Sequence, residues 1–301
     1  MEKLNKENIE DILALTPLQE GMLFHYLKEP EGNYYFEQLS LEISAKIEKE
    51  IFERAWNFVI ETNEMLRAVF RWEKVENPVQ IILKEHPLQP RYCDLPGKAP
   101  GDAQNRLEEI RGKDREQKFD LREVPFRVTL CNTGQNKYEM IISNHHILYD
   151  GWSTGIILKE FFRAYSTFSG GGKLVMPIKT KFREFLKCIK NQDETEETYW
   201  KNYLKDFDTR TPLPVKEKDI NAKTTGGIRR QRYRFSREVT AGVEAFVKKR
   251  EITLASLLYS AWGVLLQKYS DCHDVVFGTT VAGRNAAVKD VENIVGLFIN
   301  T

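Results

Sequence analysis

The residues with the clearest capacity for chemistry lie in the segment 144–153, which reads Asn-His-His-Ile-Leu-Tyr-Asp-Gly-Trp-Ser. It contains two imidazoles, His145 and His146, together with the carboxylate of Asp150 and the glycine Gly151. An imidazole titrates near neutral pH, so it can accept or donate a proton during a reaction. The segment therefore has the residue types of an acid–base site.

A metal site is one alternative for the histidine pair, and it is poorly supported. Adjacent side chains of an extended segment point to opposite faces, so His145 and His146 would not chelate one ion together. A zinc site needs three or four protein ligands, and the sequence offers no second cluster of His, Cys and Asp. We expect no metal. The other alternative is that both imidazoles are structural. The HHxxxDG spacing at a turn favours a functional interpretation instead.

The periodicity of apolar residues predicts the elements that position this segment. Alternation over 138–143 predicts a strand directly before the histidines, and helical spacing predicts a helix from about Thr154 to Tyr165 with Ser153 as its N-cap. A connection between a strand and a helix is a common place for functional side chains. Further strands are predicted at 39–43, 66–72, 79–83, 126–130, 232–235, 275–280 and 294–298, and a loop at 86–101.

The first helix and the domain boundary also have local signals. Thr16, Pro17 and Gln19 have the spacing of an N-cap, a first helical proline and a capping box. The glycines at 170–172 are the best linker candidate. Since helices and strands alternate throughout, we predict a mixed α/β fold with a boundary near this glycine run.

The composition limits the class of protein. Lys and Arg number 45 and Asp and Glu 44 in 301 residues, so the formal charge of +1 gives no overall field for nucleic acid or anionic lipid. A hydrophobic content of 41% supports a sizeable core, and the length suggests two domains or lobes. No apolar stretch approaches the ~18 residues of a membrane span. The four cysteines are scattered without a CxxC spacing, which argues against a disulfide framework. We expect a cytoplasmic protein.

Four ordered stretches carry a resemblance to a known family. Segment 144–153 resembles the HHxxxDG signature of the condensation domains of nonribosomal peptide synthetases, in the chloramphenicol-acetyltransferase-like superfamily. LTPLQEGMLFH at 15–25 and VGLFINT at 295–301 resemble other motifs of that family. NEMLRAVF at 63–70 resembles its HExLRTxF motif, with Asn63 in place of the histidine and Ala68 in place of the threonine.

The resemblance implies a fold of two lobes arranged as a V, each lobe an α+β two-layer structure. It predicts a communication or docking segment at 1–14, an N-terminal lobe with the HHxxxDG motif at 15–172, and a partial C-terminal lobe at 173–301. The family's later motifs have no counterpart before Thr301, so we expect the second lobe to be truncated. A frayed terminus is the alternative for the first segment.

The resemblance also implies the reaction and its partners. The amine of an aminoacyl group on an acceptor carrier protein attacks the thioester of an acyl or peptidyl group on a donor carrier protein. Both substrates arrive on 4′-phosphopantetheine arms, and the domain itself binds no cofactor. The segment Lys6–Ile12 resembles the one that receives a chain from a separate upstream subunit, which would place the donor carrier on another polypeptide. The configuration of the donor residue, L or D, stays open.

The resemblance assigns roles to residues of the motif. His146 is the main catalytic candidate, which would hydrogen-bond or deprotonate the amine or stabilise the tetrahedral intermediate. The N–H of Gly151 would face the oxyanion, a plain turn being the alternative. Asp150 would form a buried ion pair with Arg67, the alternative being a catalytic base, and His145 would be structural. Candidates for the substrate channel are Trp152, Ser153 and Asn300.

Three other functions stay open. A catalytically silent docking module would keep the fold and recruit a partner. An epimerization domain shares the HHxxxDG motif but normally follows a carrier domain. A general small-molecule acyltransferase of the superfamily would accept a free amine or a coenzyme A thioester. A heterocyclization domain is excluded, because it carries aspartates where this sequence has His145 and His146.

Overall fold

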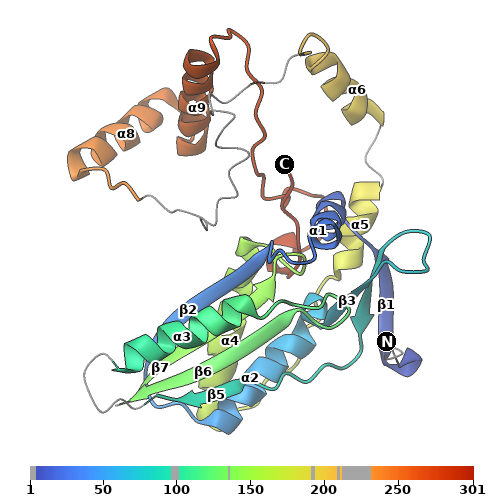
Figure 1. Cartoon of the computed structure of the whole chain (residues 1–301), viewed down its shortest axis with the longest axis vertical. Coiled ribbons are helices and arrows are strands. Elements are labelled where there is room, and N and C mark those ends of the chain that lie inside the picture. Colours follow the sequence, from blue (N-terminus) through green and yellow to red (C-terminus); the bar gives the residue numbers. More distant parts are fainter. Residues whose placement is uncertain (1–4, 96–101, 135, 191–193, 209–210, 212–231) are drawn as a thin grey trace. The chain divides into compact units, whose positions relative to one another are not determined.

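The computed structural model describes residues 5–95, 102–134, 136–190, 194–208, 211 and 232–301 (Figure 1). It divides into two compact units, which are unit 1 (Met1–Gln192 with Thr280–Thr301) and unit 2 (Asp193–Thr279). The predicted boundary after the glycine run differs from this division. Gly170 is instead the C-cap of a helix inside unit 1. The segment 280–301, which we predicted to lie in the second lobe, belongs to unit 1.

A four-stranded sheet forms the centre of unit 1. Its order is β2 (Phe36–Ser44), β7 (Lys137–His145), β6 (Phe126–Gly134) and β5 (Arg91–Asp94). The first three strands are antiparallel, and β5 runs parallel to β6. The predicted strands 126–130 and 138–143 are confirmed, and they pair with each other. The prediction of a loop throughout 86–101 was wrong, because Arg91–Asp94 pairs with the distant residues Thr129–Asn132.

A smaller sheet contains β1 (Ile9–Ala14), β4 (Val79–Leu83) and β3 (Ala68–Arg71), in that order. The predicted strand 66–72 begins instead with a 3-10 turn at Glu64–Arg67. Strand β1 pairs antiparallel with β4. A frayed terminus is therefore wrong for residues 9–14 of the predicted docking segment.

Helices cover both faces of the four-stranded sheet (Figure 1). The helices of unit 1 are α1 (Pro17–Lys28), α2 (Lys49–Thr62), α3 (Asp102–Glu116), α4 (Gly151–Ser169) and α5 (Phe182–Lys190). On one face α2 packs on α4, with the rings of Trp56 and Phe161 stacked at 4.6 Å. On the other face α3 sets Asp114 against Arg127 at 2.6 Å. The predicted capping box of α1 is confirmed, because Gln19 N donates to Thr16 Oγ1 and Thr16 N donates to Gln19 Oε1.

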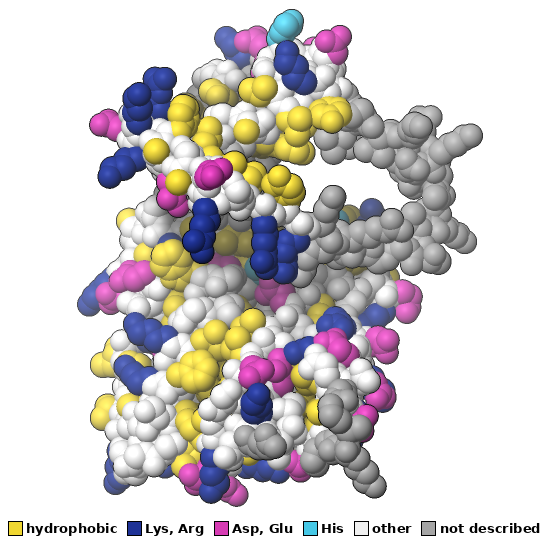
Figure 2. Space-filling view, turned by 90° about the vertical axis from the view of Figure 1, so that its left-hand side faces the viewer, with side chains coloured by type: hydrophobic (Ala, Val, Ile, Leu, Met, Phe, Trp, Pro, Cys, Tyr) yellow, Lys and Arg dark blue, Asp and Glu magenta, His cyan; other side chains and the backbone are white. Residues whose placement is uncertain are grey.

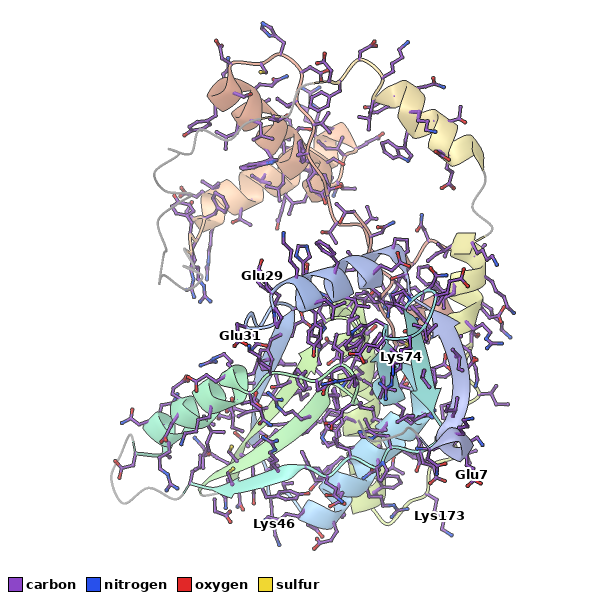
Figure 3. All side chains as sticks on the ribbon, turned by 45° about the vertical axis from the view of Figure 1, so that its right-hand side comes forward. Glu7, Glu29, Glu31, Lys46, Lys74 and Lys173 are labelled. Atoms are coloured by element: carbon purple, nitrogen blue, oxygen red, sulfur yellow. The ribbon has the colours of Figure 1, made fainter. Side chains whose placement is uncertain are left out.

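The alternation of side chains along β2 follows from these two faces. Leu39, Leu41 and Ile43 pack on the apolar core under α2 and α4. Gln38 and Ser40 point to the opposite side, where they bond to side chains of α3. Glu29 and Lys46 are exposed charged residues at the periphery of unit 1 (Figure 3).

The segment 280–301 packs into the core of unit 1 without forming a strand of either sheet. Ile294, Val295, Leu297 and Phe298 are buried, and the backbone of Val281 bonds to that of Asn300. The predicted strand 294–298 was wrong. A 3-10 turn at Val291–Asn293 precedes this stretch. The N–H groups of Gly296 and Phe298 bond to side chains of the HHxxxDG segment instead of to a neighbouring strand.

Replacement of Gly283 by alanine is expected to destabilise unit 1 by at least about 2 kcal/mol. Gly283 has a φ of +66°, and an added Cβ would lie 1.9 Å from the carbonyl oxygen of Phe298, a backbone atom that cannot move aside cheaply. Gly155 of α4 is the matched control, because an added Cβ there meets no atom within 4 Å. Gly155→Ala should stabilise by about 0.5–1 kcal/mol through helix propensity. Urea unfolding of both variants checks this, and equal effects would contradict it.

Unit 2 contains α6 (Glu194–Tyr203), α8 (Arg237–Arg250) and α9 (Leu254–Ser270). Ser236 and Thr253 cap α8 and α9, which pack on each other. The predicted strands 232–235 and 275–280 were wrong, since the described residues there are irregular. Apolar side chains of these helices, including Phe246, Leu258 and Trp262, are exposed, and yellow groups mark such side chains in Figure 2.

No helix in the described part of the chain is both long and apolar enough to span a bilayer.

Candidate active site

The HHxxxDG segment connects the end of β7 to the start of α4. The strand ends at His145 and the helix begins at Gly151. Asp150 is the N-cap, because its carboxylate accepts a hydrogen bond from Ser153 N at 3.0 Å. The predicted N-cap, Ser153, was wrong by one turn. An aspartate before the first helical residue satisfies an N–H group of that turn at least as well as a serine.

The ring of His146 has a defined tautomer. Its Nδ1 lies 2.9 Å from the carbonyl oxygen of Tyr149, and a carbonyl oxygen only accepts. Nδ1 therefore carries the hydrogen, and Nε2 of the neutral ring has a free lone pair. The backbone N–H of His146 donates to Tyr35 O at 2.8 Å, which fixes the residue from its other side. The side chain is 21% exposed.

His145 is buried, in contrast, and cannot act as a solvent-facing base. Its Nδ1 accepts a hydrogen bond from Ile147 N at 3.1 Å, which ties the loop back on itself. Burial, with a smaller contribution from neighbouring His146, lowers the pKa of His145 to about 3. The ring is therefore neutral at physiological pH, as its predicted structural role requires.

His145 is expected to make the fold less stable in mild acid. Below about pH 6.5 the unfolded chain binds a proton at this ring that the folded chain does not bind, so stability falls as the pH falls. The contribution is about 2 kcal/mol between pH 6.5 and 5. His145→Asn retains an acceptor for Ile147 N and removes this titration. The difference between the free energies of unfolding at pH 6.5 and at pH 5 should be smaller in this variant than in wild type. His25→Asn, at an exposed histidine, is the control, and an unchanged pH dependence in His145→Asn would contradict the assignment.

Gln19 supports the loop from below, a role that the sequence analysis missed. Its Nε2 donates to Ile147 O and to Gln80 Oε1, both at 3.0 Å. Gln80 of β4 in turn donates to Ala14 O at 2.8 Å. Both amides are completely buried and have partners. They connect α1 and β4 to Ile147, the residue after His146. A glutamine within the apolar run 79–83 was the signal in the sequence for this role.

Asp150 is a structural carboxylate with no exposed surface. Besides Ser153 N it accepts from Ser153 Oγ at 2.9 Å, from Phe298 N at 3.0 Å and from Arg284 Nη2 at 3.1 Å. Arg284 also donates to Val291 O and Ile294 O at 2.7 Å and lies over the ring of Phe298. We name this cluster the Asp150–Arg284 clasp, because it fastens the segment 280–301 to the start of α4.

The predicted pairing of Asp150 with Arg67 was wrong. Arg67 pairs with Glu10 of β1 at 2.8 Å and donates to Lys84 O at 2.9 Å. Its place in the 3-10 turn before β3 directs it to the smaller sheet. The cation beside Asp150 is Arg284, which the sequence analysis missed because it assigned residues 173–301 to another lobe.

Asn63, where the sequence departs from the resembled motif, is also structural. Its amide accepts from Lys179 Nζ at 2.7 Å and donates to Glu160 Oε2 at 2.7 Å. It is buried at the C-terminal end of α2. The residue therefore stabilises a contact away from His146.

The remaining candidates separate into exposed and buried residues. Gly151 is exposed at the first position of α4, and no atom lies within 4 Å of an added Cβ. Trp152 is 54% exposed and donates from Nε1 to Glu292 O at 3.0 Å. Ser153 is completely buried in the clasp, so its predicted channel role was wrong. Asn300 is exposed, and its channel role stays a prediction.

One further residue beside His146 was missed. Glu37, at the start of β2, places Oε1 3.6 Å from His146 Nε2. Its other oxygen accepts from Asn144 Nδ2 at 3.2 Å. Glu37 is the only carboxylate on the side of β2 that carries Leu39, Leu41 and Ile43. This break in an apolar face was the signal for it in the sequence. The site therefore contains an imidazole nitrogen with a free lone pair and a carboxylate next to it. Among the described residues no cluster of His, Cys, Asp and Glu is suited to a metal ion.

Comparisons with known proteins show the family of the chain. A family model described as the condensation domain matches residues 9–301. The chain is 34% identical over 303 residues to gramicidin S synthase 2 of Brevibacillus brevis, covering 100% of this chain and 7% of that protein. It is 33% identical over 305 residues to tyrocidine synthase 2 of Brevibacillus parabrevis, covering 100% of this chain and 8% of that protein. The chain thus spans less than a tenth of the length of these two relatives.

Solved structures share the fold. The first condensation domain of the CDA synthetase matches with a TM-score of 0.72 and 17% identity, over 97% of this chain and 69% of that chain. The starter condensation domain of rhizomide synthetase matches with a TM-score of 0.75 and 18% identity, over 96% of this chain and 64% of that chain. These matches confirm the predicted chloramphenicol-acetyltransferase-like fold.

Proposed function

Because the chain belongs to the condensation-domain family, we propose that it catalyses the formation of a peptide bond between two substrates held on carrier proteins. The amine of an aminoacyl group on the acceptor carrier attacks the thioester of an acyl or peptidyl group on the donor carrier. The C–N bond forms, the C–S bond breaks, and the donor thiol leaves with a proton. The observation that carries this proposal is the partly exposed His146, whose Nδ1 donates to Tyr149 O and whose Nε2 forms no hydrogen bond with the described residues.

His146 Nε2 accepts the proton that the attacking amine loses. General-base catalysis of this kind contributes ~10²–10⁴-fold to a rate. An α-amino group has a pKa near ~8, so a fair fraction is already neutral before it reaches the site. Orientation of the two tethered substrates can supply more, about 7–11 kcal/mol of the barrier. We therefore assign His146 an important share of the rate but not all of it.

The oxyanion of the tetrahedral intermediate is assigned to the N–H of Gly151. Two observations support this. The residue is the first of α4, whose N-terminal end carries partial positive charge, and it is exposed with open space beside it. The buried clasp around Asp150 holds this helix end in place.

The substrates of this reaction imply the partners. The donor is an acyl or peptidyl carrier protein of a separate upstream subunit, the acceptor is a downstream carrier protein, and both present substrates on 4′-phosphopantetheine arms in the cytoplasm. Part of the proposed docking segment 1–14 is β1, which gives it a fixed position on unit 1. The domain itself needs no cofactor in this scheme.

The test is an amide-forming assay with the chain of 301 residues. Donor acyl carrier and acceptor aminoacyl carrier are mixed with it, and the acceptor is analysed by intact-protein mass spectrometry. The expected result is acceptor carrying the joined product at a rate well above the uncatalysed control. Binding of both carriers without product would favour the silent docking module. Epimerised donor without product would favour the epimerization relative, and product from a coenzyme A thioester or a free amine would favour the general acyltransferase.

A further inference from the structure

Glu37 is placed at the site by the strand that carries it. Leu39, Leu41 and Ile43 face the apolar core, and Glu37 continues the same side of β2 toward its N-terminal end. In the antiparallel pairing, Glu37 lies opposite Asn144, and Phe36 opposite His145. The end of β2 therefore lies beside the loop that begins at the end of β7, which brings a carboxylate to His146.

The Glu37 carboxylate is held by a short chain of hydrogen bonds. Tyr149 OH donates to Asn144 Oδ1 at 2.8 Å, and Asn144 Nδ2 donates to Glu37 Oε2 at 3.2 Å. Tyr149 and Asn144 are buried, whereas the Glu37 side chain is 40% exposed. One carboxylate oxygen is thus engaged, and Oε1 faces His146. Among the described residues, no lysine or arginine forms an ion pair with Glu37.

Glu37 Oε1 and His146 Nε2 are two hydrogen-bond acceptors side by side. Because Nδ1 carries the hydrogen of the neutral ring, Nε2 offers only a lone pair, and an ionised carboxylate offers only acceptors. The two atoms lie 3.6 Å apart, too far for a direct hydrogen bond. A group with at least two hydrogens on one nitrogen can bond to both at once. An alcohol or a thiol, with a single hydrogen, cannot.

We propose that Glu37 Oε1 and His146 Nε2 together bind the α-amino group of the acceptor substrate. This inference rests on the proposed function and names the part of the substrate that the site recognises. One N–H hydrogen points to the imidazole that receives the proton, and another points to the carboxylate. After transfer, the carboxylate lies beside the imidazolium and stabilises its charge. Glu37 is thus a second catalytic residue, supplied by β2.

The test compares the binding of two acceptor mimics by isothermal titration calorimetry. One is an aminoacyl pantetheine linked by a stable amide, and the other is the same compound without the α-amino group. Wild type should bind the amino compound at least tenfold more tightly. In Glu37→Gln the glutamine oxygen is expected to face Asn144 Nδ2, which turns its NH₂ toward His146 Nε2, where it competes with the substrate. We expect the preference to fall about tenfold, to near none.

Glu42→Gln is the matched control, because Glu42 is an exposed carboxylate on the same strand. It should keep the wild-type preference, and the thermal midpoints of both variants should match wild type. A full preference in Glu37→Gln, or no preference or no binding in wild type, would overturn the inference.

The inference and the proposed function fail in different ways. An amine preference that depends on Glu37, found with no amide product in the carrier assay, would remove the reaction and leave the amine site. Amide formation with unchanged amine binding in Glu37→Gln would leave the reaction and remove Glu37 from it.

Discussion

His146→Ala is expected to lower the rate of amide formation by ~10²–10⁴-fold while the protein stays folded. The change removes Nε2, the proposed base, and also the bond from Nδ1 to Tyr149 O. Residual activity is expected, because the two carrier-bound substrates are still oriented toward each other. Single-turnover kinetics with saturating loaded carriers measure the chemical step directly.

His146→Asn separates the base from the loop support. The asparagine amide can donate to Tyr149 O in place of Nδ1, but it has no basic nitrogen. We expect His146→Asn to be as slow as His146→Ala and more stable. His25→Ala, at an exposed histidine of α1, should keep the wild-type rate. A rate within twofold of wild type in His146→Ala would remove this imidazole from the mechanism.

Asp150→Ala is expected to cost ~3–5 kcal/mol of folding free energy, because it leaves Arg284 as a buried, unpaired cation. Burial lowers the pKa of Arg284, and the Asp150 carboxylate opposes this shift. The variant also loses the bonds to Ser153 and Phe298 N. We expect a lower folded yield and a lower urea midpoint. Normal stability with lost activity would indicate direct catalysis by Asp150.

A double-mutant cycle identifies the partner of Asp150. Asp150→Ala and Arg284→Met should show a coupling energy of about 0.5–3 kcal/mol, because the two residues are in contact. Asp150→Ala and Arg67→Met are the matched pair, and their effects should add, since Arg67 pairs with Glu10. Additivity in the first cycle and coupling in the second would restore the pairing predicted from the sequence.

The sequence was informative where local rules act. Thr16 and Gln19 predicted a capping box, and alternation predicted the strand before His145. These signals depend on residues a few positions apart, so no tertiary contact is needed to interpret them. The position of His146 followed from the same strand and from the spacing of its motif.

Partners distant in the sequence could not be predicted in this way. Arg284 and Asp150 are 134 residues apart, and Glu37 reaches the site through the pairing of β2 with β7. The strand Arg91–Asp94 lies between proline-rich stretches and exists because of its pairing with β6. The stretch 294–298 is apolar enough for a strand, but its backbone bonds to the clasp.

The return of residues 280–301 to unit 1 gives unit 2 an unusual connectivity. The chain leaves unit 1 after Gln192 and re-enters it at Thr280, so unit 2 is an insertion whose two ends are both attached to the same body. Closing such an insertion costs conformational entropy. The Asp150–Arg284 clasp anchors the re-entering segment to the start of α4. Thr280, where the chain re-enters unit 1, is four residues before Arg284, so the second attachment of unit 2 is followed directly along the chain by the clasp at the start of α4.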